Sequence, residues 1–540
     1  MATTPTTDLY DGIRDAFPLE LFPWDDYFAR MAETDFLAGR ADQPAVKSYF
    51  VRKAPFGGSH ILLGGITAAL RTMNELRFDV EGQFDWGMQD MGYRQEFIDF
   101  LKARRGLRNI TVYAPPEGTP FFPNEPVVSI AGPLAEVRLA DGILISELNF
   151  ASLSLTKWNR VARTVRPGGV LEFARRRSQN HLKSSLYGML AGCIATSNSE
   201  LRRFFKVPVR GTMGHEWMQS FRSLAEAFDA WLEHQPKFPV GLVDTVRCLE
   251  EDFPAWLDAV YRHRDSIKSA DAPIWGWRND SGDLAYQVIE QYLRFQRHPL
   301  AQDQWFRERM RIFLTNELDE YSSSDIIAQI VTQASAAGFD AEDIKRRIIW
   351  AAGTKPGVCA DDPALGGVMK LMESEGRACI KLALDADGRV GMKTSIPGFN
   401  RSAMISNGSD KVGVLLYPAW RYSVTQEGKL RDNLNSQIVP VLKACHPDNA
   451  TLVHELNEYH LEPRQQVVFK DGMLTQAWED SRPTIEGVAK LVTANIDALP
   501  WWVTRIEKPH LMSVSVTPDL FGLRDRMIRA HSLQADYQPF

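Results

Sequence analysis

Eight short apolar runs recur through the middle of this 540-residue chain, and most are separated by stretches long enough for a helix. The stretches 216–232, 283–295 and 324–336 show this spacing clearly. Short apolar strands that alternate with helices predict βαβ units and a parallel sheet, and eight of them suggest a closed barrel. The runs are GGVLEF (168–173), GCIAT (192–196), VPVRG (207–211), VGLVDT (240–245), PIWGW (273–277), RIFLTN (311–316), RIIWAAG (347–353) and GGVMKL (366–371).

The two ends of the chain have a different character. Residues 1–165 mix helical spacing with short strands, and the segments HPDNATLVHELNEY (446–459) and DSRPTIEGVAKLV (480–492) are typical of loop and helix. We expect an N-terminal α+β domain over 1–165, an α/β barrel over 166–395, and a C-terminal segment over 396–540 that packs back on the N-terminal domain. The expected fold class is therefore α/β, with an irregular parallel (β/α) barrel and an α+β domain formed from both chain ends.

Composition excludes several classes of protein. Apolar residues make up 44% of the chain, as in globular proteins, and the apolar stretch 61–70 is far shorter than the ~20 residues that cross a membrane. A formal charge of −6 gives no basic surface that would favour nucleic acid as a partner. The five cysteines are scattered singly and the first residues lack the pattern of a secretory signal, so we expect a reduced, cytoplasmic compartment.

Polar residues follow seven of the eight apolar runs. Active sites of parallel barrels lie at the carboxyl ends of the strands, so this placement predicts one shared site. The residues are Arg175 and Arg176, Ser197 and Asn198, Thr212 to His215, Asp244, Arg278 with Asp280, Asn316, and Gly353 with Thr354.

The most informative local pattern is GWRNDSGDLAYQ (276–287). Arg278 offers a planar fork for phosphate oxygens, and the carboxylates of Asp280 and Asp283 suit ribose hydroxyls or a hydrated Mg²⁺. Gly282, just before a helix, leaves backbone N–H groups open to an anion. The alternative is an ordinary helix capped by Ser281 or Asp280, with Arg278 paired to Asp283.

Three further clusters support an anionic ligand. EFARRRSQN (172–180) places three arginines at a strand end, although a solvated basic turn is the alternative. His215 in GTMGHEWMQ (211–219) fits an acid, a base or a phosphate acceptor, and it lacks a second metal ligand at helical spacing. Glycines in AAGTKPGV (351–358) and PALGGVMKL (363–371) lie where barrels bind phosphate through backbone amides. The residues alone predict a phosphosugar-binding barrel enzyme with no named substrate.

With these residues in place, the chain resembles the nicotinate phosphoribosyltransferase family over nearly its whole length. A dozen collinear motifs carry the resemblance. They are TDLY (7–10), FVRKAPFGG (50–58), EGTPFFPNEPVVSIAGPL (117–134), LNFASLSLTKWNR (148–160), EFARRRSQ, IATSN, PVRGTMGHEW, LVDT, WRNDSGDL, LTNELDE, AAGT and DPALGGVMKL. Three departures from the family pattern are Ala174, where glycine is usual, the loop GTKPG (353–357), and the segment PGFNRSAMI (397–405), which lacks a lysine two residues after its glycine.

The resemblance implies formation of nicotinate mononucleotide and pyrophosphate from nicotinate and phosphoribosyl pyrophosphate, in NAD biosynthesis or salvage. It implies Mg²⁺ as cofactor, ATP as co-substrate, and a head-to-tail homodimer with the active site at the interface. Three alternatives remain open on sequence. One is the same reaction on nicotinamide, and another is a non-catalytic nucleotide-binding homologue. The third is a lyase or isomerase for another phosphosugar, with Lys370 as its base.

The resemblance also assigns roles to individual residues. His215 matches the histidine that ATP phosphorylates, and Tyr10 of the partner subunit and Phe173 match the aromatic pair that holds the pyridine ring. Arg176 and Arg278 match residues that meet phosphate and the nicotinate carboxylate. The remaining expected residues are Asp244 and Asp280 for ribose, Gly353 and Gly367 for the 5′-phosphate, Thr212, Ser281, Gly282 and Thr354 for substrate, and Asp280 with Asp283 for Mg²⁺.

Overall fold

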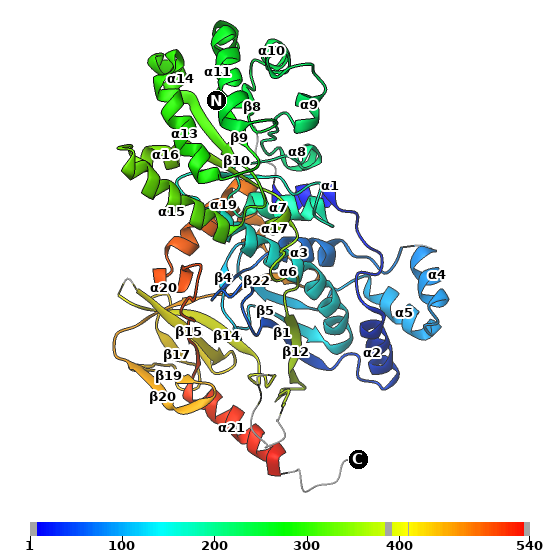
Figure 1. Cartoon of the computed structure of the whole chain (residues 1–540). Helices are drawn as coiled ribbons and strands as arrows, with labels where there is room; N and C mark the ends of the chain where they lie inside the picture. Colours follow the sequence, from blue (N-terminus) through cyan, green and yellow to red (C-terminus); the bar gives the residue numbers. More distant parts are fainter. Residues whose placement is uncertain (1–7, 81, 384–390, 392, 409, 534–540) are drawn as a thin grey trace. The chain divides into compact units, whose positions relative to one another are not determined.

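The computed structural model describes residues 8–533, except residues 81, 384–390, 392 and 409 (Figure 1). The described chain divides into two compact units. The central unit spans Thr156–Pro363, and the composite unit combines the residues up to Leu155 with those from Ala364 onward. The sequence-based boundaries, by comparison, lie at 165/166 and 395/396.

The central unit is built on a parallel sheet of six hydrogen-bonded strands in the order β7-β6-β11-β10-β9-β8. Its strands are mostly buried, as expected where helices cover a parallel sheet. The predicted parallel α/β sheet is thus confirmed for six of the eight apolar runs. The strands are β6 (Gly169–Glu172), β7 (Ala195–Thr196), β8 (Val240–Leu242), β9 (Trp275–Asn279), β10 (Met310–Leu314) and β11 (Ile348–Ala352).

The other two apolar runs differ from the expectation. In the described structure VPVRG makes a single isolated parallel bridge, between Val209 and Thr196. GGVMKL lies in β12 (Gly367–Ser374), which pairs antiparallel with β1 (Pro44–Val51) in the composite unit. Its predicted place in the parallel barrel is wrong. β12 alternates buried and half-buried residues, which is typical of an antiparallel strand rather than of a fully buried parallel one.

Helices connect the parallel strands, and polar side chains begin several of them. The stretch 216–232 forms two helices because the Ser223 hydroxyl accepts a hydrogen bond from the Glu226 N–H and starts a new helix there. The stretches 283–295 and 324–336 lie in helices as predicted. The α-helices of this unit after α6 (Leu134–Thr164) are α7 (His181–Leu190), α8 (Ser199–Phe205), α9 (His215–Gln219), α10 (Leu224–His234), α11 (Phe253–Arg262), α12 (Arg264–Ser269), α13 (Leu284–Arg297), α14 (Gln304–Arg309), α15 (Glu320–Ala336), α16 (Ala341–Arg347) and α17 (Thr354–Gly357).

The composite unit joins the two chain ends in one antiparallel sheet of order β13-β12-β1-β5-β3-β22-β23. β3 from the N-terminal part pairs with β22 from the C-terminal part. Its remaining strands are β3 (Thr111–Ala114), β5 (Val128–Pro133), β13 (Arg377–Ala378), β22 (Gln466–Lys470) and β23 (Met473–Leu474), and its main N-terminal helices are α1 (Leu9–Ala16), α2 (Asp26–Leu37), α3 (Ile66–Glu75), α4 (Gln83–Asp90), α5 (Gln95–Arg104) and the start of α6 (Leu134–Thr164).

A second sheet of the composite unit has the order β20-β19-β24-β15-β14-β21. The expectation of loop and helix over 446–459 is wrong, because this segment completes the hairpin of β19 and β20. β20 is an exposed edge strand, so its polar sequence resembles a loop. The helix predicted within 480–492 is confirmed, because α19 begins at Ile485. The elements are β14 (Asn400–Asn407), β15 (Asp410–Pro418), β19 (Leu442–His446), β20 (Asn449–Leu456), β21 (His460–Pro463), β24 (Val514–Val516), α19 (Ile485–Asp497) and α21 (Pro518–Leu533).

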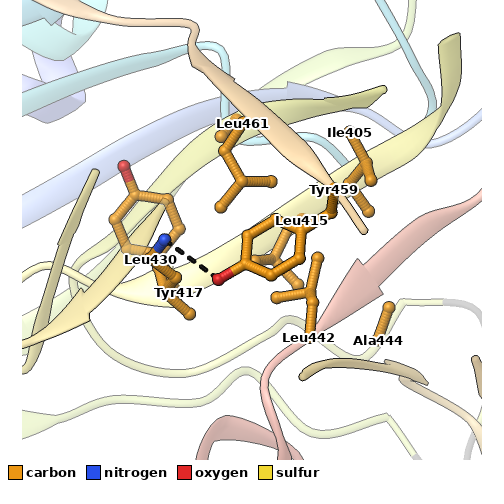
Figure 2. Close-up of a cluster of buried hydrophobic side chains, with 9 residues drawn as sticks. Ile405, Leu415, Tyr417, Leu430, Leu442, Ala444, Tyr459 and Leu461 are labelled. Carbon is orange, nitrogen blue, oxygen red and sulfur yellow. Dashed lines mark hydrogen bonds between the residues drawn. The ribbon is translucent and has the colours of Figure 1, made fainter. Parts of the chain in front are cut away.

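The core of this second sheet is an apolar cluster, which we call the Tyr459 cluster (Figure 2). Leu415 is fully buried in it, and the Tyr459 hydroxyl donates to the Val439 carbonyl (2.5 Å) and accepts from the Leu430 N–H (3.3 Å). The buried members are Ala403, Ile405, Leu415, Tyr417, Leu430, Leu442, Ala444, Tyr459 and Leu461.

Candidate active site

Three predicted site residues of the central unit meet around one imidazole. His215 begins α9, Asp244 follows β8 and Asp280 follows β9. His215 Nε2 lies 3.3 Å from Asp244 Oδ1, and Nδ1 lies 3.9 Å from Asp280 Oδ2. The Asp244 side chain is 2% exposed and that of His215 is 38% exposed. A buried carboxylate therefore orients an imidazole that stays accessible, as a residue accepting a group from a ligand requires.

Arg278, near the end of β9, connects the loops that follow three of the apolar runs. Its Nη1 donates to Thr212 Oγ1 (2.6 Å) and to the Met213 carbonyl (3.2 Å), and its Nε donates to Thr315 Oγ1 (3.3 Å). Its Nη2 lies 3.2 Å from Asp280 Oδ2. The alternative pairing of Arg278 with Asp283 is wrong. We call His215, Asp244, Arg278, Asp280 and Thr315 the Arg278 cluster.

Asp280 is the carboxylate of this cluster that lies next to Arg278. Burial by itself would raise its pKa, but the charge of Arg278, a hydrogen bond from the Thr315 hydroxyl and the proximity of His215 outweigh burial and lower the pKa. Asp280 is therefore ionised at neutral pH, which suits a group that accepts hydrogen bonds from ribose hydroxyls.

The loop between β9 and α13 has a fixed shape. Asp244 Oδ2 accepts from the Asp280 N–H (2.9 Å) and from the Ser281 hydroxyl (2.6 Å). Gly282 has φ +81°, a backbone conformation that residues with a side chain rarely adopt, so this position favours glycine. Asp283, rather than Ser281 or Asp280, caps α13 by accepting from the Tyr286 N–H (3.0 Å).

Comparison with known proteins decides the family. The pattern described as nicotinate phosphoribosyltransferase N-terminal domain matches residues 24–149, and that of the C-terminal domain matches residues 432–524. A nicotinate phosphoribosyltransferase of Mycobacterium tuberculosis is 30% identical over 368 residues, covering 66% of this chain and 71% of the relative. The chain belongs to the nicotinate phosphoribosyltransferase family.

Relatives of this family also cover the chain at full length. The nicotinate phosphoribosyltransferase of Bacillus subtilis is 26% identical over 517 residues, which is 95% of each chain. The crystal structure of human nicotinic acid phosphoribosyltransferase is 24% identical, has a TM-score of 0.71, and covers 93% of this chain and 99% of its own. The second comparison shows a shared fold.

The segment matching the family's aromatic and arginine motif follows β6. The Phe173 N–H donates to the Ala352 carbonyl (2.8 Å), so this loop is joined to the end of β11. Arg175 Nη1 donates to Asn198 Oδ1 (2.6 Å), and both Arg175 and Arg176 are exposed. The structure brings Phe173 close to the loop of Gly353, because a Cβ on that glycine would lie 3.0 Å from the Phe173 carbonyl oxygen.

Glu172, which the sequence analysis does not single out, supports this same segment. Its carboxylate is fully buried and accepts from the Ala174 N–H (2.6 Å) and from the Thr196 hydroxyl, and Thr196 in turn accepts from the Asn198 N–H (2.9 Å). Burial raises its pKa, although these hydrogen bonds act in the opposite direction. The available signal was an acidic residue at the end of an apolar strand.

Two of the three departures from the family pattern, Ala174 and the GTKPG loop, lie against each other. Thr354–Gly357 forms the short helix α17 after Gly353, and a Cβ on Gly357 would overlap the Ala174 side chain. The Ala174 side chain therefore occupies the space that a side chain at position 357 would need, which glycine leaves free. The other predicted phosphate glycine, Gly367, begins β12 in the composite unit. Its phosphate role stays a prediction.

Tyr10, the predicted aromatic partner, lies in α1 of the composite unit. Its ring is 4% exposed within the chain, and its hydroxyl donates to Glu75 Oε1 and accepts from Asn74 Nδ2, both at 3.1 Å. Burial, together with Glu75, raises its pKa to about 12. The Arg482 guanidinium lies 5.0 Å from the ring centre. Stacking of Tyr10 on the pyridine of a partner subunit stays a prediction.

Within the described part of the chain, no three histidine, cysteine or acidic residues are arranged to hold a metal ion. Magnesium needs no such cage, since it is commonly held by one or two carboxylates together with substrate phosphates and water. Asp280 supplies an ionised carboxylate at the site, and one oxygen of Asp283 is used in the helix cap. The donor set fits Mg²⁺ shared with a polyphosphate.

None of the described helices is long and apolar enough to span a membrane.

Proposed function

We propose that this protein transfers the phosphoribosyl group of phosphoribosyl pyrophosphate to the ring nitrogen of nicotinate, producing nicotinate mononucleotide for NAD biosynthesis or salvage. The observation that carries the proposal is the Arg278 cluster. A cationic fork and two carboxylates at the carboxyl ends of neighbouring parallel strands are what a phosphorylated ribose needs. Membership of the nicotinate phosphoribosyltransferase family supplies the substrates.

The central sheet is proposed as the wall of an irregular (β/α) barrel. Ala195 in edge strand β7 and Val240 in the opposite edge strand β8 belong to one apolar cluster with Leu171, Phe313 and Ala351. In a flat six-stranded sheet the two edges would be about 24 Å apart, at about 4.8 Å per strand. A common cluster supports a sheet that curls toward closure.

The proposed reaction needs no protein nucleophile. The pyridine nitrogen forms a bond to C1 of the ribose while the bond from C1 to the pyrophosphate oxygen breaks, through an oxocarbenium-like state. Arg278 neutralises the leaving pyrophosphate, and Asp280 and Asp244 position the ribose. Mg²⁺, held by Asp280 and Asp283, would supply further positive charge to the pyrophosphate. Phe173 and Tyr10 of the partner subunit would fix the ring plane.

ATP enters the proposal through His215. The γ-phosphoryl group of ATP would form a bond to an imidazole nitrogen while its bond to the β-phosphate oxygen breaks, which gives a phosphohistidine and releases ADP. Asp244 beside Nε2 would orient the ring. The acid is preferred over nicotinamide, since arginines next to Phe173 favour a carboxylate by about 1.5–3 kcal/mol per charge-assisted hydrogen bond.

We place the reaction in the cytoplasm and in a homodimer. The five cysteines, all unpaired in the structure, support a reducing compartment.

The test uses purified protein with nicotinate, phosphoribosyl pyrophosphate and Mg²⁺, with and without ATP, followed for the mononucleotide. Absence of product under all conditions would contradict the transferase. Preference for nicotinamide in a competition assay would select the alternative substrate, and ligand-induced stabilisation without turnover would select the non-catalytic alternative.

The phosphohistidine is tested separately. Labelled ATP should leave an acid-labile, alkali-stable phosphoryl group on the native protein but not on His215→Ala. That variant should keep part of the ATP-independent transfer and lose the stimulation by ATP, whereas Asp280→Ala should lose both. Full ATP stimulation in a stable His215→Ala protein would refute the role of His215 and leave the transferase unaffected.

A further inference from the structure

Asn279, the last residue of β9, places a polar side chain in the packed face of the central sheet. Successive side chains of a strand point to opposite faces, so Asn279 lies opposite Arg278 and on the same face as Trp277. Asn279 and Trp277 are both fully buried, and the Trp277 ring meets the edge of Phe253 from α11. A buried amide costs free energy unless it is hydrogen-bonded, so an apolar residue would be the ordinary choice here.

Gln291 of α13 supplies the partner of this amide. Its Nε2 donates to Asn279 Oδ1 (2.8 Å), and Asn279 Nδ2 donates to Gln291 Oε1 (2.9 Å), which closes a pair of facing amides. Gln291 Oε1 also accepts from the Trp277 indole N–H (2.8 Å), and Gln291 is itself fully buried. We call Asn279 and Gln291 the amide pair. All four of its side-chain polar atoms are hydrogen-bonded.

The thiol of Cys248 connects the amide pair to the segment that follows β8. Its Sγ donates to Asn279 Oδ1 (3.6 Å) and accepts from Gln291 Nε2 (3.3 Å). Burial, together with the charges of Asp244 and Asp252, raises the pKa of this thiol to about 12, so it keeps its proton at neutral pH. The amide pair therefore joins β9, α13 and the segment after β8 behind the Arg278 cluster.

The backbone of Asn279 holds the other side of the same strand end. Its carbonyl accepts from the Thr315 N–H (2.9 Å), and the Thr315 hydroxyl, 3.1 Å from this carbonyl, donates to the Asp280 carboxylate. The Asp280 N–H in turn donates to Asp244 Oδ2 (2.9 Å). A rotation of the peptide between Asn279 and Asp280 would therefore move the Asp280 carboxylate away from both Thr315 and Arg278.

We propose that Asn279 and Gln291 are positioning residues for the Arg278 cluster, because their amide pair fixes the end of β9 and with it the direction of the Asp280 carboxylate. Two apolar side chains of similar size would fill the same space. They would not select one orientation of the strand end, because apolar packing is not directional and hydrogen bonds are. The effect on phosphoribosyl transfer rests on the proposed function, whereas the fixed geometry of the strand end does not.

The first experiment replaces both amides together. Asn279→Leu/Gln291→Met, the apolar variant, leaves neither amide facing an unpaired partner, so its stability should lie closer to native than that of either single variant. Asp280 acts most strongly on the transition state, where a misdirected carboxylate costs most. We expect kcat per titrated active site to fall about tenfold or more, and KM for phosphoribosyl pyrophosphate to change less than about threefold.

Two matched variants separate positioning from stability. Asn279→Gln/Gln291→Asn, the exchanged variant, keeps two facing amides and should recover part of the kcat that the apolar variant loses. Gln329→Leu removes the hydrogen bond of an exposed amide to Asp325 in α15 and should leave kcat unchanged. A purely structural role predicts instead that kcat per active site stays native in every folded variant.

Hydrogen exchange gives a readout that needs no transferase activity. Peptides covering residues 279–283 and 312–316 contain the Asp280 and Thr315 N–H groups that hold the strand end. We expect exchange of these peptides to become about tenfold faster or more in the apolar variant and to stay native in Gln329→Leu. Native exchange in a well-folded apolar variant, or native kcat in the same protein, would overturn the proposal.

The outcomes separate this proposal from the proposed function. Faster exchange in the apolar variant of a protein without transferase activity would support the positioning role and contradict the transferase. Native exchange and native kcat in an active apolar variant would refute the positioning role and leave the transferase standing. Should the apolar variant not fold, Asn279→Ser, which removes the amide and adds no bulk, decides by the same two measurements.

Discussion

The Arg278 cluster of the central unit and the Tyr459 cluster of the composite unit are both largely buried, but they are held by opposite kinds of interaction. Around Arg278, polar side chains fix one another through charge-assisted hydrogen bonds. Around Tyr459, aliphatic side chains pack together and one hydroxyl bonds to two backbone groups (Figure 2). Substitutions around Arg278 should therefore mainly lower the catalytic rate. Substitutions around Tyr459 should mainly lower the free energy of unfolding.

The largest effect is expected in the Tyr459 cluster. Leu415→Ala removes a fully buried side chain from β15 and should lower the free energy of unfolding by about 2–5 kcal/mol, since lost apolar burial and a cavity both contribute. Urea unfolding measures this. Val412→Ala, on the same strand but 44% exposed, should change stability by less than about 0.5 kcal/mol. Equal effects of the two substitutions would contradict the comparison.

The next effect is expected in catalysis. Arg278→Ala removes the donors to Thr212 and Thr315 and the partner of Asp280, so kcat/KM for mononucleotide formation should fall by about 100-fold or more. Stability should fall less than in Leu415→Ala, because few apolar contacts are lost, and the fall reflects the partners that Asp280 and Thr315 lose. Arg262→Ala, which removes an exposed ion pair with Asp229, is the matched control and should leave kcat/KM unchanged. A variant of Arg278 that lost stability and kept activity would reverse the comparison.

A smaller effect is expected from the Tyr459 hydroxyl, a polar group in the apolar cluster. Tyr459→Phe keeps the ring and removes the hydroxyl that bonds to Val439 and Leu430, so the free energy of unfolding should fall by about 0.5–1.5 kcal/mol. Tyr261→Phe, at an exposed ring in the central unit, is the control and should be neutral. A loss as large as that of Leu415→Ala would show that the hydroxyl, rather than apolar packing, holds this cluster.

The sequence predicted what depends on local spacing. Apolar runs located six strands of the parallel sheet, and polar residues after them located the Arg278 cluster. Pairing partners are set by distant parts of the chain, so β12 was predicted in the wrong sheet although its strand character was correct. The exposed edge strand β20 was missed for a related reason, because a strand with little buried surface lacks apolar alternation.

Contacts between distant positions were equally hidden from the sequence. Ala174 and GTKPG are two separate departures along the chain, yet the structure places the alanine side chain where Gly357 has no Cβ. Glu172 looked like one more polar residue, because neither its burial nor its bonds to Thr196 and Ala174 can be read from spacing. Such pairs become visible only when the strand order is known.

The smallest predicted effect compares two carboxyls of the central unit, Asp280 and Glu172, in their dependence on pH. The pKa of Asp280 is lowered, since Arg278, Thr315 and His215 outweigh burial. Its charge therefore stabilises the folded state above the unfolded pKa of about 3.9, and this contribution is lost as pH falls through the lower folded pKa. The pKa of Glu172 is raised by burial, so its contribution has the opposite sign. It is present below the unfolded pKa of about 4.3 and is lost as pH rises through the higher folded value.

Unfolding free energies measured between pH 3 and 7 for the native protein, Asp280→Asn and Glu172→Gln check these signs. The advantage of the native protein over Asp280→Asn should shrink below about pH 4, because the two side chains become alike once the acid is protonated. Relative to Glu172→Gln, the native protein should instead gain stability as pH falls from 7, as the buried carboxyl takes up its proton. Parallel pH profiles for all three proteins would mean that neither carboxyl has a shifted pKa, and the charge balance inferred for the Arg278 cluster would then be wrong.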